Sequence, residues 1–278
     1  MSPAAGSRVL LHGGAQVPTL GLGTSPLLGE EARAAVASAL DAGYRLIDTS
    51  EQYRNETSVG QAVRESDVPR EDIFVETKLN VRWHGEDLAT EGYKASLERL
   101  GLDYANMLLI HWPNPWLDRY VNAWKGLIRL RDEGRVRAIG TSNFTPAHLD
   151  RLLSATGVPP EVNQVEIDPT LPRKDWRAFH DIHGIVTECW SPLGRGGALL
   201  SDDVVAEVAA RHQKTPAQVV LRWHVQLGMV PVVRSSNPVR IAENIDIFDF
   251  ELTTEDLLIL DRLDRGRMPA RDPDEHGH

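Results

Sequence analysis

The chain has 278 residues, of which 41% are hydrophobic and 25% are charged, so it is long enough to bury a large core. Its formal net charge of −10 argues against a general affinity for nucleic acid or for an anionic membrane, since both require clustered positive charge. The single cysteine, Cys189, excludes an internal disulfide framework and a paired-cysteine metal site. We expect a cytoplasmic protein with neither a signal peptide nor a membrane span.

Short apolar runs alternate along the chain with longer segments of helical period. A small hairpin is predicted over residues 10–17, where two apolar runs flank a Gly-Gly turn. Strands are predicted at 19–24, 45–48, 73–78, 106–112, 136–142, 162–167, 184–190 and 228–233. Helices are predicted at 30–43, 86–101, 120–134, 145–157 and 215–228, and the last two begin with Thr-Pro, a cap followed by a favourable first residue.

This alternation predicts a single (β/α)8 TIM barrel spanning residues 1–278, preceded by a short N-terminal β-hairpin. A doubly wound sheet is the competing architecture, but nucleotide binding there is indicated by G-x-G-x-x-G after the first strand. The stretch "GLGTS" at 21–25 has two glycines and lacks the third. The barrel is therefore the favoured fold.

Several predicted strands end on polar residues: Asp48, Lys78, His111, and the pair Ser142 and Asn143; the strand at 162–167 also reaches Gln164. Taken singly, each has an ordinary interpretation, such as a helix cap, a salt bridge or a hydrogen-bonded core histidine. In a barrel, however, the carboxyl ends of the strands surround the active site, so these side chains are expected to converge.

Tyr53 lies just beyond Asp48 and completes an ionisable cluster. A tyrosine is a weak acid unless a cation stabilises its phenolate, and Lys78 paired with Asp48 can supply that cation. With His111 donating a hydrogen bond to a carbonyl oxygen, the cluster suits carbonyl reduction by an external reductant. A Schiff-base aldolase using Lys78 is the alternative, but it would need a neutral lysine beside Asp48.

Three stretches resemble the sequence signatures of the aldo-keto reductases: "GYRLIDTSEQYRNE" at 43–56, "LLIHWP" at 108–113 and the segment 230–256. The likeness covers nearly the whole chain and is greatest to the prokaryotic branch that includes the 2,5-diketo-gluconate reductases. It implies a (β/α)8 barrel that reduces aldehydes, ketones or dicarbonyls with NADPH. It also implies a catalytic tetrad of Asp48, Tyr53, Lys78 and His111, with Tyr53 as the general acid.

The resemblance further implies the cofactor-binding residues. Those expected near the nicotinamide and pyrophosphate are Thr24, Ser142, Asn143, Gln164, Trp190, Ser191, Leu193 and Gly194. Those expected near the adenosine end are Arg234, Ser235, Ser236, Arg240, Glu243 and Asn244. Arg234 replaces the lysine usual in the family, yet two arginines and two serines around one phosphate still favour NADPH over NADH. The alternative for Arg234 and Arg240 is surface ion pairing.

Substrate contacts are expected from His111, Trp112 and Asn80, of which Asn80 departs from a tryptophan common in related enzymes. The polar tail at 271–278 is expected to fray. A long carboxy-terminal loop that closes the pocket is not expected, so we expect a relatively open site for a small carbonyl substrate. No metal site is expected. The family implies a monomer, and its barrel has also been reused in nucleotide-sensing subunits, which is the non-enzymatic alternative.

Overall fold

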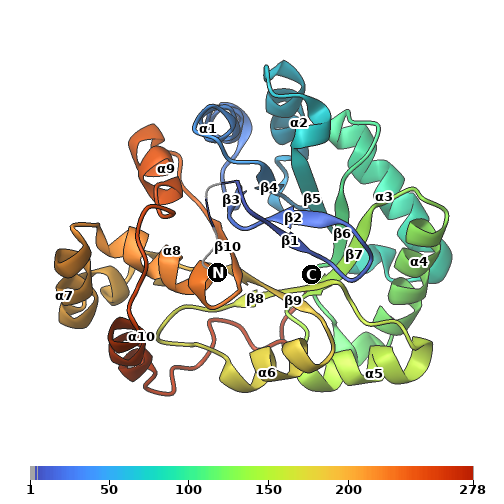
Figure 1. Cartoon of the computed structure of the whole chain (residues 1–278). Helices are drawn as coiled ribbons and strands as arrows, with labels where there is room; N and C mark the ends of the chain where they lie inside the picture. The colour runs from blue at the N-terminus through green and yellow to red at the C-terminus, as the bar shows by residue number, and fades with distance from the viewer. Residues whose placement is uncertain (1–3, 5, 278) are drawn as a thin grey trace.

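The computed structural model describes residue 4 and residues 6–277 and confirms the predicted barrel (Figure 1). Eight parallel strands pair in sequence order, and the last pairs with the first to close the barrel. They are β3 (Gly21–Gly23), β4 (Leu46–Asp48), β5 (Phe74–Leu79), β6 (Met107–Ile110), β7 (Ala138–Ser142), β8 (Val162–Glu166), β9 (Val186–Trp190) and β10 (Val230–Val233).

Helices surround the barrel on its outside, as Figure 1 shows. The five predicted helices correspond to α1 (Gly29–Asp41), α3 (Glu86–Leu100), α4 (Tyr120–Asp132), α5 (Pro146–Thr156) and α8 (Pro216–Gln226). Thr145 and Thr215 cap α5 and α8 through capping boxes, as their Thr-Pro sequences predict. Helices outside the prediction are α2 (Glu56–Glu65), α6 (Lys174–Ile182), α7 (Asp203–His212), α9 (Pro238–Ile245) and α10 (Thr254–Leu260).

The predicted hairpin is formed by β1 (Arg8–Leu10) and β2 (Gln16–Pro18), which pair antiparallel with Val9 opposite Val17. It lies in front of the barrel in the view of Figure 1, across the amino end of the strands. Leu11 and Val17 are buried in one apolar cluster with residues of the barrel interior. The hairpin therefore closes the amino end of the barrel.

The interior of the barrel is apolar near this end and polar near the other. Side chains alternate along each strand, so every second residue points inward. The inward residues near the hairpin are Leu46, Phe74, Met107, Leu109, Ala138, Val162, Val230 and Val232. Further along the same strands lie Asp48, Glu76, Lys78, Ser142, Gln164 and Glu188.

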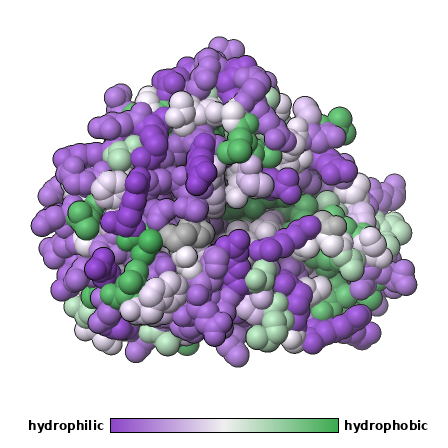
Figure 2. Space-filling model, turned by 180° about the vertical axis from the view of Figure 1, so that it is seen from behind, coloured by the Kyte–Doolittle hydropathy of each residue, from purple (hydrophilic) through white to green (hydrophobic). Residues whose placement is uncertain are grey.

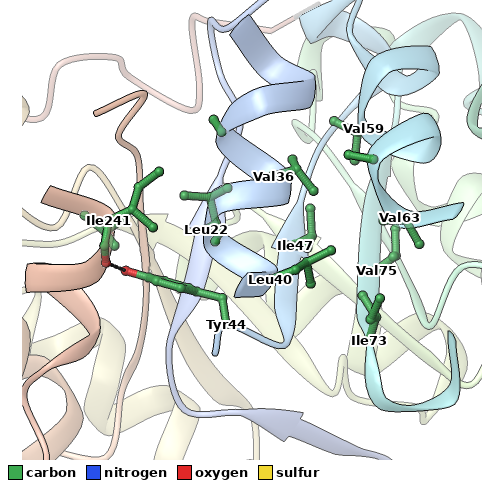
Figure 3. Packing of buried hydrophobic residues seen from close by; sticks show 14 of the residues in the cluster. Leu22, Val36, Leu40, Tyr44, Ile47, Val59, Val63, Ile73, Val75 and Ile241 are labelled. Atoms are coloured by element: carbon green, nitrogen blue, oxygen red, sulfur yellow. Dashed lines mark hydrogen bonds between the residues drawn. The ribbon is translucent and has the colours of Figure 1, made fainter. Parts of the chain in front are cut away.

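The outer faces of the strands pack against the helices, as Figure 3 shows for β3, β4 and β5 with α1 and α2. Ile47 of β4 is fully buried between Val36 and Val63 of these helices, within one cluster. Tyr44 joins α9 to this cluster, because its hydroxyl donates to Ile241 O over 3.2 Å. Truncating a buried isoleucine such as Ile47 to alanine costs about 2–5 kcal/mol.

Within the described part of the chain, the helices are too short or too polar to cross a lipid bilayer.

Candidate active site

The polar strand ends converge at the end of the barrel opposite the hairpin. Figure 2 views this side and shows a hollow near its middle. Asp48 and Ser142 are the last residues of β4 and β7, Lys78 is the penultimate residue of β5, and His111 follows β6 directly. Gln164 lies at the centre of β8 and is in register with Ser142 of β7.

Asp48 and Lys78 form a buried ion pair between neighbouring strands. The lysine side chain is fully buried, and its ammonium also donates to Thr49 O over 3.2 Å. Burial opposes the lysine charge, but Asp48, Tyr53 and Glu76 together raise the pKa of Lys78 above its usual value. A charged lysine is what a phenolate-stabilising cation requires, whereas a Schiff-base lysine must be neutral.

Tyr53 ends a short 3-10 helix, η1 (Glu51–Tyr53), that follows β4 and is capped by Ser50. Its ring centroid lies 5.1 Å from the Lys78 ammonium and 5.6 Å from the His111 ring centroid, at an interplanar angle of 83°. Burial raises the pKa of Tyr53 to about 12, although Lys78 acts in the opposite direction. The tyrosine is therefore a neutral phenol at physiological pH, with a cation beside it.

His111 is buried and held by hydrogen bonds on its own backbone and ring. Its Nδ1 lies 3.1 Å from Ser50 Oγ, and this oxygen accepts a hydrogen bond from Gln52 N. The Ser50 hydroxyl can then donate to Nδ1, which favours the histidine tautomer with its proton on Nε2. Such a histidine is a hydrogen-bond donor for a carbonyl oxygen.

The residues predicted near the nicotinamide form one hydrogen-bonded group. Ser142 Oγ donates to Gln164 O over 3.0 Å, and Asn143 Nδ2 donates to His111 O over 3.1 Å. The indole N–H of Trp190 donates to Asn143 Oδ1 over 2.8 Å. Asn143 has a φ of 64°, in the left-handed region that asparagine tolerates better than most residues. This group lies at the strand ends, where the prediction placed it.

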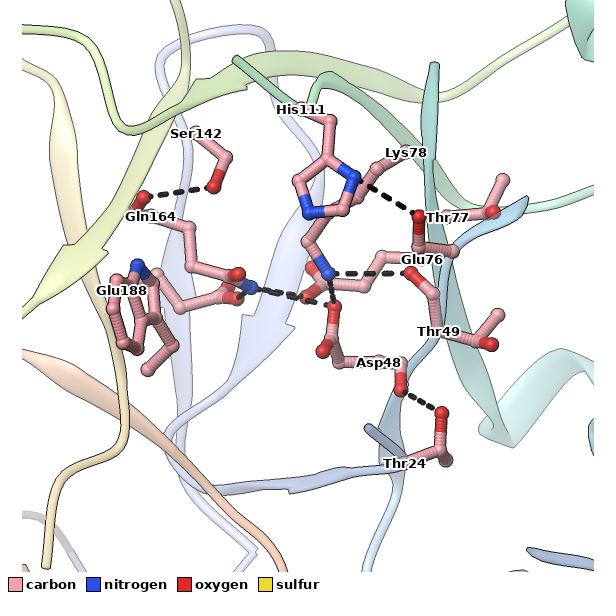
Figure 4. A network of polar contacts seen from close by, with 12 residues as sticks. Thr24, Asp48, Thr49, Glu76, Thr77, Lys78, His111, Ser142, Gln164 and Glu188 are labelled. Carbon is pink, nitrogen blue, oxygen red and sulfur yellow. Dashed lines mark hydrogen bonds and ion pairs between the residues drawn. The ribbon is translucent and has the colours of Figure 1, made fainter. Parts of the chain in front are cut away.

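Gln164 contacts buried carboxylates that the sequence did not indicate as its partners. Its amide nitrogen donates toward the carboxylates of Asp48, Glu76 and Glu188 inside the barrel (Figure 4). A contact with the cofactor carboxamide remains a prediction. Thr24 is also fully buried, and its hydroxyl donates to Asp48 O over 2.9 Å, so its cofactor contact gains no support from the structure.

Ser191, Leu193 and Gly194 lie in the segment after β9, which turns sharply. Ser191 and Gly194 have φ values of 52° and 64°. The following residue, Arg195, places its guanidinium 5.2 Å from the Trp190 ring centroid. A residue that the sequence did not single out thus lies against the ring on which the nicotinamide was predicted to stack.

The residues predicted for the adenosine phosphate gather at the start of α9. Arg234 and Arg240 are exposed, and neither makes an ion pair within 4.0 Å with another described residue. Ser235 is buried and its hydroxyl accepts from Asn237 N over 3.1 Å, while Ser236 is exposed. Further along α9 lie Glu243, which is half-buried, and Asn244, which is buried. The surface ion pairs considered as an alternative are absent among these described residues.

The predicted fraying of the tail is wrong for the part of the tail that the structure describes. The His276 ring lies 4.7 Å from that of Trp112, centroid to centroid, and Asp274 lies 3.0 Å from Nε2 of His148. The tail therefore lies against Trp112, next to His111, so this side of the predicted site is less open than expected. His278 lies outside the described residues.

Arg267 fixes the start of this tail. Its guanidinium lies 2.8 Å from Asp168 Oδ2 and 3.2 Å from Glu166 Oε1, and both carboxylates are almost fully buried. The Ala270 N–H donates to Glu166 Oε2 over 2.8 Å. These contacts join residues about one hundred positions apart, and nothing in the local sequence indicates them.

Of the predicted substrate residues, Trp112 is buried beside His111, and Asn80 donates to Gln52 Oε1 over 2.7 Å. Sequence reasoning also missed Glu76 and Glu188 inside the barrel. A signal for both was available, because each lies two residues before an inward-facing site residue on its strand.

A cavity of about 650 Å³ lies at the hairpin end of the barrel, lined by residues that include Arg8, Gln16, Phe74, Asn106 and Arg137. None of the predicted site residues lines it. The ionisable cluster lies at the opposite end of the barrel.

A (β/α)8 barrel with a buried Asp-Lys pair, a tyrosine and a histidine at one end matches the aldo-keto reductase architecture that the sequence signatures imply. The model of the aldo/keto reductase family matches residues 13–265, and the chain belongs to this family.

Curated relatives confirm the prokaryotic branch. The chain is 48% identical over 268 residues to 2,5-diketo-D-gluconic acid reductase B of Corynebacterium sp., covering 96% of this chain and 97% of the relative. It is 44% identical over 271 residues to a putative methylglyoxal reductase, DkgA, of Salmonella typhi, covering 97% and 98%.

Solved structures agree with the fold. A variant of Gox0644 in complex with NADPH aligns with a TM-score of 0.93 and 40% identity, covering 98% of this chain and 99% of that one.

Proposed function

We propose that this protein reduces aldehydes, ketones or dicarbonyls to alcohols with NADPH. The observation that carries the proposal is the buried Asp48–Lys78 ion pair with its ammonium 5.1 Å from the Tyr53 ring, beside His111. Relatives named as a 2,5-diketo-gluconic acid reductase and a methylglyoxal reductase support a small carbonyl substrate. We place the whole chain, residues 1–278, in one monomeric cytoplasmic domain.

The side chains present suit NADPH. Arg234 and Arg240 are exposed cations without a described acidic partner, and the hydroxyls of Ser235 and Ser236 lie between them in sequence. Guanidinium groups bind phosphate through paired hydrogen bonds, so this cluster favours the 2′-phosphate that distinguishes NADPH from NADH. We propose that the other cofactor-binding residues are Thr24, Ser142, Asn143, Gln164, Trp190, Ser191, Leu193, Gly194, Glu243 and Asn244. NADPH, when bound, supplies the hydride.

Each residue of the tetrad has a separate role at the carbonyl oxygen of the substrate. His111 donates from Nε2 to that oxygen and orients it, since Ser50 occupies Nδ1. The Tyr53 phenol donates its proton to the alkoxide oxygen of the product. Lys78 stabilises the phenolate that remains, and Asp48 keeps the lysine protonated. Trp112 and Asn80 are the other residues that we propose to contact the substrate.

The test measures oxidation of NADPH and of NADH by the purified protein with a panel of aldehydes, ketones and dicarbonyls. We expect turnover with NADPH that is lost in Tyr53→Phe, while binding of NADPH, followed by quenching of tryptophan fluorescence, is retained. Full turnover in Tyr53→Phe would refute the assignment of the general acid. Tight NADPH binding without turnover on any carbonyl would instead indicate the nucleotide-sensing subunit.

A further inference from the structure

Two glutamates lie inside the barrel, directly behind the ion pair of the site. Glu76 comes from β5 and Glu188 from β9, on opposite sides of the interior, and both are fully buried. Figure 4 shows them pointing toward Gln164 and Asp48. Carboxylate oxygens of Asp48, Glu76 and Glu188 lie within 4.8 Å of one another. Such close approach of three acids in a dry interior needs a compensating positive charge or a proton.

The hydrogen-bond donors around these acids are too few for three carboxylates. Gln164 Nε2 lies 3.0 Å from Glu76 Oε1 and 3.4 Å from Asp48 Oδ1, and it also contacts Glu188 Oε1. An amide nitrogen has only two hydrogens to donate. The second oxygens of Glu76 and Glu188 are buried and accept no hydrogen bond from a described residue. The pair therefore has room for a proton of its own.

Few other ionisable groups face the pair. Strands β3, β6, β7 and β10 contribute none. Glu166 on β8 is held by Arg267, and Cys189 on β9 packs outward in an apolar cluster. The groups that remain are Asp48 on β4, Lys78 on β5, and Tyr53 and His111 in the segments that follow β4 and β6.

The balance of charges, like the shortage of hydrogen-bond donors, indicates that the pair Glu76 and Glu188 holds a proton. Lys78 supplies one positive charge against three buried acids, and an uncompensated buried carboxylate takes up a proton. Burial, together with Glu188 and Asp48, raises the pKa of Glu76 well above its usual value. Burial and Asp48 also raise the pKa of Glu188, while hydrogen bonds from Glu76 and Gln164 oppose the rise. Two neighbouring acids with these shifts titrate as one unit.

We propose that Glu76 and Glu188 share one proton and act as a positioning pair, whose single negative charge lies behind Lys78 and holds both Lys78 and Tyr53 in their protonated forms. The role of the pair in catalysis rests on the proposed reductase function, whereas the shared proton does not. A metal ion at this place would have to displace the Gln164 amide and lie beside the Lys78 ammonium, so the donor set favours a proton.

The shared proton is tested by infrared spectroscopy of the cofactor-free protein at neutral pH. The wild type should show the carbonyl stretch of a buried carboxylic acid. Glu76→Gln and Glu188→Gln should each lose this band, because the remaining glutamate ionises against the neutral amide. Glu56→Gln is the matched control: Glu56 is buried but paired with Arg99 over 2.6 Å, so the band should remain. Persistence of the same band in both single variants, or a stoichiometric divalent metal in the purified protein, would overturn the proposal.

The effect on Tyr53 is tested with the double variant Glu76→Gln/Glu188→Gln, which removes the charge of the pair. In each single variant the remaining glutamate keeps one negative charge, so the pH at which Tyr53 ionises should change little. In the double variant the tyrosine should ionise about one pH unit lower, the shift expected when one charge within roughly 10 Å is removed. Ultraviolet difference titration against Tyr53→Phe measures this shift without turnover, and circular dichroism checks the fold.

Kinetics give the second readout. Because the protonated phenol is the proton donor, the alkaline limb of kcat/KM for reduction should move about one unit toward neutral pH in the double variant. An unmoved titration and an unmoved limb would refute the positioning role while leaving the reductase function intact. A wild type that reduces no carbonyl would refute the proposed function, and the infrared and titration results would still decide whether the pair shares a proton and controls Tyr53.

Discussion

Replacing Arg267 with leucine should release the C-terminal tail from the barrel and destabilise the protein. The guanidinium bridges two carboxylates, of Glu166 and Asp168, whose side chains are only 3% and 1% exposed, while Arg267 itself is 35% exposed. Breaking a buried ion pair leaves an unpaired charge, but partial exposure of the arginine and the remaining bonds from Ala270 N and Thr170 N limit the loss. We expect a loss of about 2–3 kcal/mol in the free energy of unfolding.

For a chain of this size that loss corresponds to a fall in Tm of roughly 3–5 °C. Urea unfolding followed by tryptophan fluorescence measures it, and KM should rise because the His276–Trp112 contact is loosened. The matched control is Arg265→Leu, in which a 76% exposed arginine lies 4.0 Å from Asp202, and we expect a change below about 0.5 kcal/mol. Equal losses in the two variants would refute the conclusion that the Arg267 pairs anchor the tail.

Three further predictions concern stability and cofactor choice. Burial lowers the pKa of His180 from 6.5 to about 4, so the stability that neutral His180 contributes is present above about pH 6.5 and is lost as pH falls toward 4. In His180→Gln the free energy of unfolding, measured with urea at pH 7 and pH 5, should therefore fall less between the two pH values than in the wild type. An equal fall in both proteins would contradict the reasoning. Gly60→Ala should lower Tm, because the added Cβ would lie 1.8 Å from Leu100 O. The expected loss in the free energy of unfolding is about 1–3 kcal/mol or more. An unchanged Tm would mean that α2 and α3 do not approach so closely. Arg234→Ser should raise the Kd for NADPH about tenfold and that for NADH little, measured by fluorescence quenching, and equal weakening would argue against a phosphate contact.

The barrel and the end that carries the candidate site could be predicted because their signals are local. Each strand is a short apolar run, and a polar residue at its carboxyl end, such as Asp48 or His111, is visible in the sequence. Thr145 and Thr215 mark helix starts for an equally local reason, since a cap bonds within its own first turn.

What could not be predicted depends on contacts across the closed barrel. Alternation along β5 and β9 can place Glu76 and Glu188 inward, but only closure of the barrel brings both within reach of Gln164. The same holds for Arg267 and Glu166, whose pairing joins the tail to β8 over 101 positions. Polar residues near the chain end suggest fraying unless their distant partners are known.

The hairpin at the amino end has a consequence for exchange with solvent. Because Leu11 and Val17 pack at that end against a layer of apolar side chains, we expect water and hydrogen ions to reach the buried acids mainly from the opposite end. The route passes the ion pair and the tyrosine of the site. Deuterium uptake by the interior carboxyl group should therefore slow when a ligand fills the mouth of the barrel, and it should accelerate if the hairpin is removed.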